Sequence, residues 1–516
     1  MPGLPQRWWW PRVRRAHDVA SIRAVEAALM QSLPAGMLME RAATGLVSAV
    51  VDVGGGAYGL RVVLLVGSGD NGGDALLAGS HLATRGARVD AVLLGTTTHD
   101  HLDALLLAGG RVHGADALDG LEDHQWWQTA EVVIDGIVGI GGVGGLREPA
   151  ASVAAKIPDE ALVIAVDIPS GVDADTGEVH GVALPADLTV CMGTYKTGLL
   201  VEPGSGYAGK VQLVDIGLNP TLPEPVAEAL QVSDVVEGLP IPALNSDKFR
   251  RGVVGVVAGS SAFPGAAVLC VAGAIRAGAG YVRLLAPAAV IALVHEEFPE
   301  VVAMPLPDIP VPEMAAQMIG LVGQVQSWVI GPGAGTDEYS MALLQEVLES
   351  GSPVLIDADA LTLVSQDPDL IQVISRRPAA TLMTPHAGEL ARLLAVERSD
   401  VEARPLHFVQ EAAARFGCTV LLKGPVTLVA HTGQPTRANS TGTSWLGTAG
   451  SGDVLSGLAG TYLAAGLDSR EAGSMAAFIH GVAGQLLSKG EISPLRSREL
   501  ADALPDAVAA IRGSRT

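Results

Sequence analysis

Oxygen-bearing side chains end or directly follow apolar runs in the first half of the chain. These residues are Asn71, Asp135, Asp167 and Ser170. Ligands of an open parallel sheet bind beyond the carboxyl ends of its strands, so the four side chains could converge at one edge. A set made only of oxygen atoms, without His or Cys, favours a hard cation over zinc. The alternative is that each Asp only caps the helix that follows it.

A glycine-rich turn surrounds the first of these residues. Residues 67–72 (GSGDNG) follow an apolar run and open an expected helix, and Asp90 lies about twenty residues further on, which matches the GxGxxG fingerprint of dinucleotide-binding folds. Three polar side chains, those of Asp70, Asn71 and Asp74, would crowd a pyrophosphate turn. Simple NAD(P) binding is therefore the weaker interpretation of this turn.

In the second half, residues 450–457 (GSGDVLSG) open an expected helix. Glycines at a helix start expose N–H groups that can hold a phosphate, aided by the helix dipole. Asp453 beside them can accept a hydroxyl proton during phosphoryl transfer. The string is not a Walker loop, because it lacks GK[ST]. An ordinary Gly-Asp helix cap is the alternative.

Other strings of the second half also stand at expected strand ends. Two of them, residues 259–267 and 331–335, are rich in small residues and leave room for a ligand near the backbone. His386 is either a ligand contact or a structural histidine with satisfied hydrogen bonds. Residues 423–427 lie between two expected strands, where a nucleotide could bind. Lys423 could equally be a surface charge.

Both halves repeat a short apolar run, a glycine-rich turn and an Ala/Leu-rich helix. This pattern predicts an α/β fold with parallel sheets covered by helices on both faces. The strands expected in the first half are residues 61–66, 87–94, 131–134, 162–166, 188–192 and 211–215. Those expected in the second half are residues 253–257, 282–285, 327–330, 354–356, 380–383, 420–422 and 427–430.

A proline-rich stretch, residues 219–226 (NPTLPEPV), is typical of a linker between domains. The expected organisation has four parts. They are a frayed N-terminal extension over residues 1–16, a Rossmann-like three-layer domain over 17–220, a linker over 221–227 and a second α/β domain over 228–513.

The composition of the 516-residue chain excludes several classes of protein. With 48% hydrophobic and 17% charged residues, the chain is not disordered. A net charge of −22 argues against a sequence-independent nucleic-acid binder and against docking on an anionic membrane. Residues 252–275 lack charges and could span a bilayer, but Gly and Pro interrupt them. We therefore expect a strand, a loop and a buried helix there.

The three cysteines, Cys191, Cys270 and Cys418, lie far apart and form no CxxC pair. This spacing predicts neither a zinc site nor a disulfide framework. Buried reduced thiols fit a reducing cytoplasm, so we expect a cytoplasmic protein.

The first half resembles the epimerase domain of the NAD(P)HX repair enzymes. The strings DNGGD, VIDGIVGIGGVGG and AVDIPSGVDADTGEV carry the resemblance, and MERAA and YKTGL also fit it. It covers residues 17–220 and implies potassium ligands at Asn71, Asp135 and Ser170. It implies substrate contacts at Asp70, Asn71, Gly72, Gly73, Asp74, Gly139, Ile140, Gly141, Gly142, Val143, Gly144, Gly145 and Asp167, and we take Asp167 as catalytic. Asp70 and Ala75 stand where the family usually has Asn and Gly, and neither change removes a mapped ligand.

Residues 244–513 are similar to the NAD(P)HX dehydratase domain, which has a ribokinase-like α/β fold. The similar strings are FPGAA, RAGAGYVRL, VIGPGAG, LIDADAL, MTPHAGEL, VLLKGP and AGSGDVLSG. The resemblance implies contacts with the damaged nicotinamide nucleotide at Ala266, Gly333, His386 and Asp453. It implies contacts with the adenine nucleotide at Lys423, Gly424, Pro425, Val426, Thr427 and Gly452. Trp445 makes residues 439–447 bulkier than is usual in the family.

The resemblance implies two linked reactions on NADHX and NADPHX, which carry a hydroxyl on carbon six of the nicotinamide ring and occur as two epimers. The first domain would interconvert the R and S epimers, and the second would dehydrate the S form at the expense of ADP. We expect the hydroxyl to be phosphorylated and then eliminated, with Asp453 as the base and backbone N–H groups of residues 450–452 stabilising the phosphoryl group. Magnesium would bridge the nucleotide phosphates. We expect ADP rather than ATP, as in bacterial members, and a homo-oligomer.

Two other functions are compatible with parts of the pattern. A vitamin kinase of ribokinase type, fused to a dinucleotide-binding module, would accumulate a phosphorylated product, but it leaves DNGGD and AVDIPSGVD unexplained. A non-catalytic NAD-sensing or RNA-associated scaffold would need basic patches or lost catalytic positions, and the net charge and Asp453 count against it.

Overall fold

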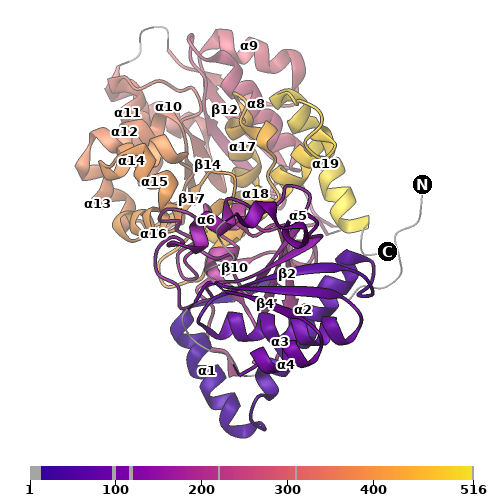
Figure 1. The fold of residues 1–516 in the computed structure, drawn as a ribbon. Coiled ribbons are helices and arrows are strands. Elements are labelled where there is room, and N and C mark those ends of the chain that lie inside the picture. Colours follow the sequence, from indigo (N-terminus) through magenta and orange to yellow (C-terminus); the bar gives the residue numbers. More distant parts are fainter. Residues whose placement is uncertain are drawn as a thin grey trace. The chain divides into compact units, whose positions relative to one another are not determined.

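The computed structural model describes residues 13–95, 100–114, 120–218, 221–243, 245–307, 309 and 311–513. The chain forms two compact units, one over residues 15–227 and one that begins at Glu228 (Figure 1). Each unit is a parallel or mostly parallel sheet with helices on both faces, which confirms the expected α/β class.

The N-terminal unit is built on a seven-stranded parallel sheet with the strand order β4-β3-β2-β5-β6-β7-β9. The strands are β2 (Arg61–Val66), β3 (Arg88–Leu93), β4 (Arg111–His113), β5 (Val132–Gly136), β6 (Leu162–Val166), β7 (Leu188–Met192) and β9 (Lys210–Val214). The helices are α1 (Val19–Ser32), α2 (Met37–Gly54), α3 (Asp70–Thr84), α4 (Leu102–Leu107), α5 (Gln125–Gln128) and α6 (Ala150–Ala154). The central strands consist of consecutive apolar residues because both of their faces are covered.

Alternate residues of β2 belong to two separate cores. Val62 and Leu64 pack in a core with buried residues of α1, α2 and α3. Val63 and Leu65 face the opposite core, which includes Trp127 of α5 and residues of α6. The side chains of a strand alternate between its two faces, so this single apolar run packs against both helix layers. This packing places the start of α3 at the edge of the sheet.

The C-terminal unit contains a sheet with the strand order β13-β12-β11-β14-β15-β16-β17-β18-β19, in which the last two pairings are antiparallel. The strands are β11 (Val253–Val257), β12 (Tyr281–Ala286), β13 (Val302–Pro305), β14 (Ser327–Ile330), β15 (Val354–Ile356), β16 (Thr381–Met383), β17 (Thr419–Leu422), β18 (Thr427–Ala430) and β19 (Thr436–Asn439). The division between the two units falls within the short strand β10 (Ala227–Ala229), after Ala227.

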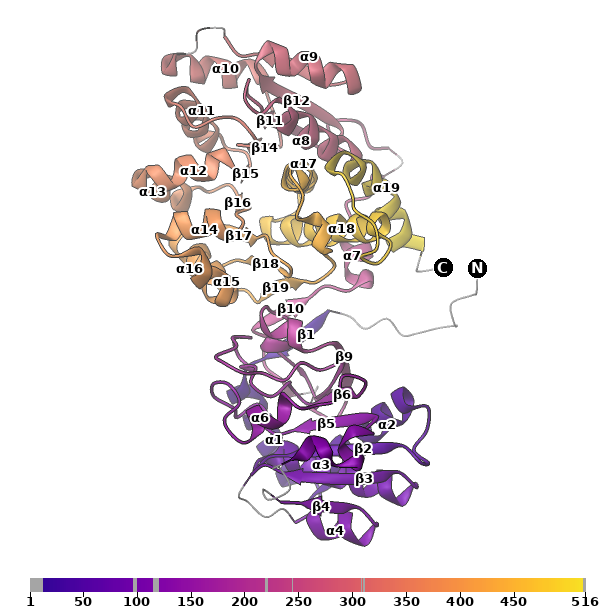
Figure 2. The same ribbon diagram turned by 45° about the horizontal axis from the view of Figure 1, so that its top comes forward.

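Two helix layers enclose this sheet. One contains α10 (Ala315–Val322), α11 (Glu338–Glu349), α12 (Asp359–Gln366), α13 (Pro368–Arg376), α14 (Ala387–Leu394), α15 (Arg398–Ala403) and α16 (Pro405–Phe416). The other contains α8 (Pro264–Arg276), α17 (Ser451–Ala464), α18 (Ser469–Ser488) and α19 (Ser497–Gly513). Figure 2 shows the two layers on opposite sides of the strands. The short α7 (Val232–Gly238) and α9 (Ala288–Glu297) complete the unit.

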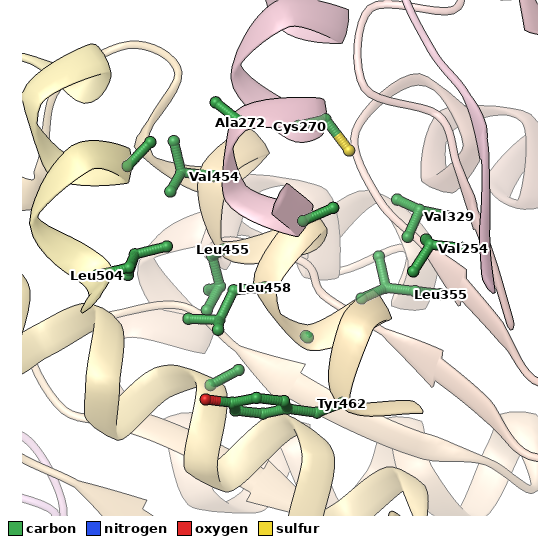
Figure 3. Packing of buried hydrophobic residues seen from close by; sticks show 14 of the residues in the cluster. Val254, Cys270, Ala272, Val329, Leu355, Val454, Leu455, Leu458, Tyr462 and Leu504 are labelled. Atoms are coloured by element: carbon green, nitrogen blue, oxygen red, sulfur yellow. The ribbon is translucent and has the colours of Figure 1, made fainter. Parts of the chain in front are cut away.

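Helix α17, which carries Asp453 in its first turn, is buried against α8. A Cβ atom on Gly457 would lie 1.9 Å from the backbone oxygen of Cys270, and one on Gly273 would lie 2.3 Å from the backbone oxygen of Val454. The two helices therefore meet backbone to backbone. Figure 3 shows Val454, Leu455, Leu458 and Tyr462 of α17 in the core they share with strand residues such as Val329.

The N-terminal extension differs from the expectation. Residues 1–12 lie outside the described part of the chain, but Arg14–His17 form strand β1, which pairs with β8 (Tyr195–Lys196). Residues 14–16 are therefore not frayed. The expected linker also makes contacts, because the Val226 N–H donates to the Ala16 oxygen at 2.9 Å and the His17 ring bonds to the Pro223 oxygen.

The uncharged stretch 252–275 contains strand β11, the turn before α8 and most of α8, as its Gly and Pro residues indicated. Within the described residues, no helix is both long enough and apolar enough to span a bilayer.

Candidate active sites

A cavity of about 890 Å³ opens at the carboxyl edge of the N-terminal sheet. Its lining includes the turn after β2 and the glycine-rich loop after β5, so both predicted substrate loops face one space. The predicted residues that line it are Asp70, Asn71, Asp74, Gly139, Ile140, Gly141, Gly142, Val143, Gly144, Gly145 and Asp167. Gly72 and Gly73 are buried in the first turns of α3 instead.

Of the predicted potassium ligands, Asn71 lines this cavity, whereas Asp135 and Ser170 are not among its lining residues. Asp135 is fully buried at the end of β5, where its two carboxylate oxygens accept hydrogen bonds from the Ser170 hydroxyl at 2.6 Å and the Ser170 N–H at 2.8 Å. The amide oxygen of Asn71 faces the loop, because a Cβ on Gly139 would lie 2.3 Å from it. Burial raises the pKa of Asp135 to about 6, and the hydrogen bonds from Ser170 act in the opposite direction. A bound cation would favour the ionised carboxylate, and carboxylate, hydroxyl and amide oxygens suit a hard ion.

Asp167 is held in one orientation at the end of β6. Its backbone lies in the left-handed region with φ of +67°. A residue other than glycine adopts this conformation only where the surrounding structure holds it in place. Its carboxylate accepts a hydrogen bond from the Met192 N–H at 2.8 Å and forms a close ion pair with Lys196. Lys196 is fully buried and also donates to the Met192 oxygen at 2.8 Å. Burial alone would lower the pKa of Lys196, but the charge of Asp167 raises it above the ordinary value.

Asp74 lines the same cavity from α3 without comparable partners. Its side chain is buried, and among the described residues no donor bonds to its carboxyl group. Burial raises the pKa of Asp74 to about 8, and the negative charges of neighbouring carboxylates act in the same direction. Those neighbours are Asp167, Asp70 and Glu26.

Asp90 does not have the role that the dinucleotide fingerprint requires. It lies inside β3 rather than at its carboxyl end, and its buried carboxylate bonds to Arg111 at 2.6 Å and to His113 at 2.7 Å. The His113 ring in turn stacks on Trp126 with ring centroids 4.1 Å apart. Asp90 therefore ties β3 to β4, and it is not available for a ribose hydroxyl.

In the C-terminal unit, Asp453 stands in the first turn of α17, and the left-handed glycine Gly450, with φ of +88°, caps the start of this helix. Burial raises the pKa of Asp453 to about 7, and the charge of Asp357 contributes in the same direction. Lys423 acts in the opposite direction. Asp453 is therefore available as a base near neutral pH.

Lys423 brings a positive charge to this site. Its ammonium group bonds to Asp357 at 2.8 Å and lies 3.8 Å from Glu389, and a Cβ on Gly452 would lie 3.4 Å from it. Ser456 of α17 donates to the other oxygen of Asp357 at 2.7 Å. Lys423 is thus not a surface charge. It lies against the glycine turn that opens α17, where a phosphate could bind.

His386 serves as the N-cap of α14. Its Nδ1 accepts hydrogen bonds from the N–H groups of Gly388 and Glu389, and the Glu389 carboxylate accepts one from the His386 N–H. Burial lowers the pKa of His386. Nδ1 of His386 therefore has the structural role that the sequence analysis gave as one alternative, with its hydrogen bonds satisfied within the protein. Nε2 remains on the outer side, 3.7 Å from Glu389, on a side chain that is 58% exposed and open to a ligand.

Ala266 and Gly333 lie together beside a second cavity. Gly333 has φ of +59°, and a Cβ on it would lie 2.8 Å from the Ala266 side chain, so a larger residue would disturb both loops. A cavity of about 350 Å³ next to them is lined by residues 259–261 and by Ala334 and Gly335. Both small-residue strings that the sequence singled out thus border one space at the carboxyl edge of the sheet.

Sequence reasoning missed several charged residues of the two sites, although they stand in the quoted strings. Lys196 belongs to YKTGL, Asp357 to LIDADAL and Glu389 to MTPHAGEL. Their positions were visible, but their pairing with Asp167 and Lys423 depends on contacts over long sequence distances. Trp445 lies in a short 3₁₀ helix, and its ring N–H donates to the Glu491 backbone oxygen.

The fold and the two sites define a class of protein: a two-domain α/β enzyme with one site at the carboxyl edge of each sheet. One of the sites combines a glycine-rich helix start with the lysine Lys423 and the carboxyl group of Asp453. The family profile described as NAD(P)H-hydrate dehydratase matches residues 254–506. The profile described as the YjeF-related protein N-terminus matches residues 35–198.

Relatives match both domains together. The bifunctional NAD(P)H-hydrate repair enzyme of Mycobacterium leprae is 43% identical over 479 residues, which cover 92% of this chain and 94% of the relative. The protein of the same name from Thermofilum pendens is 32% identical, with 94% of each chain covered. A crystal structure of an ADP/ATP-dependent NAD(P)H-hydrate dehydratase from Bacillus subtilis, with ATP and Mg²⁺, is similar at 26% identity and a TM-score of 0.47, covering 55% of this chain and 97% of that chain.

The chain therefore belongs to the bifunctional NAD(P)H-hydrate repair enzymes, and it combines an NAD(P)HX epimerase with an NAD(P)HX dehydratase. This finding confirms the expected function. It does not support the alternative, a vitamin kinase fused to a dinucleotide-binding module.

Proposed function

We propose that the two activities of this chain reside at the carboxyl edges of the two sheets and that each depends on a carboxyl group there. The dehydratase site is centred on Asp453, and the observation that carries this proposal is the position of Asp453 in the first turn of α17 beside Lys423. Asp453 accepts the proton of the substrate hydroxyl as that oxygen attacks the phosphoryl group of the adenine nucleotide. AMP leaves as the phosphoryl group is transferred. The phosphorylated oxygen, now a better leaving group, departs as phosphate while the neighbouring ring carbon loses a proton, and the new double bond gives NAD(P)H.

The surrounding residues hold the two reactants. Backbone N–H groups of residues 450–452 and the ammonium group of Lys423 offset the charge of the phosphoryl group during transfer. The remainder of residues 423–427 contacts the adenine nucleotide, together with Gly452. Ala266, Gly333 and the Nε2 atom of His386 contact the damaged nicotinamide nucleotide, either NADHX or NADPHX.

Magnesium would be carried to this site by the nucleotide. Among the described residues, no three His, Cys, Asp or Glu side chains are grouped so as to hold a metal ion. Mg²⁺ is commonly bound through substrate phosphates with few protein ligands, so the arrangement accords with it. When bound, it neutralises charge on the phosphate oxygens. We propose ADP as the phosphoryl donor.

In the N-terminal unit, we propose that Asp167 acts on the hydroxylated ring carbon of the substrate. The two glycine-rich loops bind the nucleotide through backbone N–H groups. Asn71, Asp135 and Ser170 would hold a potassium ion against the loop of residues 139–145 and thereby order that loop. The oxygen-only donor set and the buried charge of Asp135 support this assignment.

We further propose that the enzyme works in the cytoplasm as a homo-oligomer. Three free, buried cysteines accord with a reducing compartment. Light scattering of the purified chain tests the oligomeric state.

One assay tests the proposed function. The absorbance of NADH is followed after adding the enzyme to a mixture of R- and S-NADHX, with and without ADP and with and without potassium. Complete recovery of NADH is expected only with ADP, and potassium should accelerate the late phase, in which the R form is consumed. Recovery without any adenine nucleotide would contradict the phosphorylation step.

A further inference from the structure

Two carboxyl groups of the epimerase cavity have opposite surroundings. Asp167 accepts a hydrogen bond from the Met192 N–H and forms an ion pair with Lys196. Both partners stabilise the ionised carboxylate, which is the form that can accept a proton. Asp74 is buried in the wall of the same cavity, and no donor or cation bonds to its carboxyl group among the described residues. A buried carboxyl group without such partners is favoured in its neutral form, which carries a proton.

The charges around Asp74 strengthen this contrast. The charged neighbours of Asp74 are Glu26 of α1, Asp70 of α3 and Asp167 at the sheet edge. The cations Arg23 and Lys196 act on Glu26. The ammonium group of Lys196 is paired with Asp167 and donates to the Met192 oxygen, so it stabilises the charge of Asp167 rather than that of Asp74. Three carboxylates therefore surround Asp74 and disfavour a fourth negative charge.

Epimerisation of the substrate needs one proton donor and one proton acceptor. The hydroxylated ring carbon bears an oxygen and the ring nitrogen, and this group opens when the hydroxyl loses a proton and the nitrogen gains one. Two titratable groups held in opposite protonation states in one cavity are the usual arrangement for such chemistry. We propose that Asp74 is the proton donor and Asp167 the proton acceptor of the epimerase. This inference rests on the proposed function of the N-terminal unit.

The step balances without a further reactant. The Asp167 carboxylate takes the hydroxyl proton, a carbonyl forms at the ring carbon, and the bond to the ring nitrogen breaks with its electron pair going to nitrogen. The nitrogen takes the proton of the Asp74 carboxyl group. Rotation about the adjacent carbon–carbon bond presents the other face of the carbonyl to the nitrogen. On closure the nitrogen returns its proton to Asp74, the oxygen recovers its proton from Asp167, and the opposite epimer is formed.

The first test compares Asp74→Asn with Asp167→Asn in the full-length enzyme. Purified R-NADHX is incubated without adenine nucleotide, so that the dehydratase is idle, at saturating potassium, and the S form is measured by chromatography after subtraction of the spontaneous rate. Because Asn keeps the shape of Asp74 but has no acidic proton to give, kcat of Asp74→Asn should fall by a factor on the order of 10² with little change in KM. Asp52→Asn on the exposed face of α2 is the matched control and should retain the wild-type rate.

The second test uses pH and needs no substitution at Asp74. Because the reaction requires protonated Asp74, the wild-type epimerase rate should fall as the pH rises above about 8. Glu26→Gln removes one negative neighbour, which stabilises the ionised form of Asp74 and should move this fall to lower pH. A purely structural role of Asp74 would produce neither effect.

The outcomes separate the inference from the function on which it rests. If the wild-type chain does not accelerate interconversion of the epimers, both the proposed site and this inference are wrong. If the wild type does so and Asp74→Asn, with unchanged dehydratase activity on S-NADHX, is as fast, only the inference is wrong. A wild-type rate that does not fall above pH 8, or a fall that Glu26→Gln leaves in place, would also overturn it.

Discussion

Dehydration by the C-terminal unit should depend on pH through Asp453. The base must be ionised to accept the substrate proton, and burial with the neighbouring charge of Asp357 raises the pKa of Asp453 to about 7. The active form is the deprotonated one, so activity should increase with pH. Asp453→Asn removes the proton acceptor while keeping the shape of the helix start, and should leave nucleotide binding intact.

The size of both effects follows from this pKa. A group with a pKa near 7 is roughly one-tenth ionised at pH 6 and nine-tenths ionised at pH 8, so the rate should increase roughly tenfold between them. Asp453→Asn should lower kcat by a factor on the order of 10² or more. Asp357→Asn removes a neighbouring negative charge and releases Lys423 from its ion pair at 2.8 Å. Both changes lower the pKa of Asp453, so the pH midpoint should move down.

The assay follows NADH absorbance from pure S-NADHX with ADP and magnesium, and calorimetry measures nucleotide affinity in parallel. Asp506→Asn, on the exposed face of α19, is the control for removal of an acidic charge elsewhere in the same unit. Near-normal turnover of Asp453→Asn, or a wild-type rate that is constant between pH 6 and 8, would refute the assignment of Asp453 as the base.

Three further predictions concern packing, the cation and the division of the chain. Gly457→Ala places a Cβ 1.9 Å from the Cys270 oxygen and should lower the free energy of unfolding by roughly 1–3 kcal/mol in chemical denaturation, whereas Gly320→Ala, with no atom near the new Cβ, should not. Asp135→Asn should abolish potassium stimulation of epimerisation and leave dehydration of S-NADHX unchanged; a joint loss would refute a local role. Residues 228–513 alone should convert S-NADHX quickly and leave R-NADHX to spontaneous epimerisation, and fast complete conversion of a mixture would contradict the assignment of the epimerase.

The central strands could be predicted from the sequence because both of their faces are buried. Residues 61–66, 162–166 and 253–257 consist mainly of apolar residues, and the observed strands have the same bounds. The strands that were missed are at most four residues long, and all of them except β13 contain polar or charged residues. Strand β1 has the sequence RRAH, and its pairing with β8 joins residues about 180 positions apart, which no local pattern can indicate.

The same limit applies to the sites. The oxygen-bearing residues at strand ends could be predicted because the topology of a parallel sheet brings those ends together. The ionisation of each carboxyl group could not, because it depends on neighbours from other elements. Asp90, Asp167 and Asp74 look alike in the sequence, yet Asp90 is neutralised by Arg111, Asp167 by Lys196, and Asp74 by no described cation.

The two proposed carboxyl groups require opposite ionisation states, and this limits the pH at which both reactions run. Asp453 must be ionised, which favours dehydration above about pH 7, and Asp74 must be protonated, which favours epimerisation below about pH 8. Conversion of a mixture of epimers should therefore be limited by the dehydratase at acidic pH and by the epimerase at alkaline pH. Above pH 8, the time course should split into a fast phase on the S form and a slow phase on the R form. Because each limit belongs to a different unit, Asp357→Asn should extend only the acidic side of the range, and Glu26→Gln should narrow only the alkaline side.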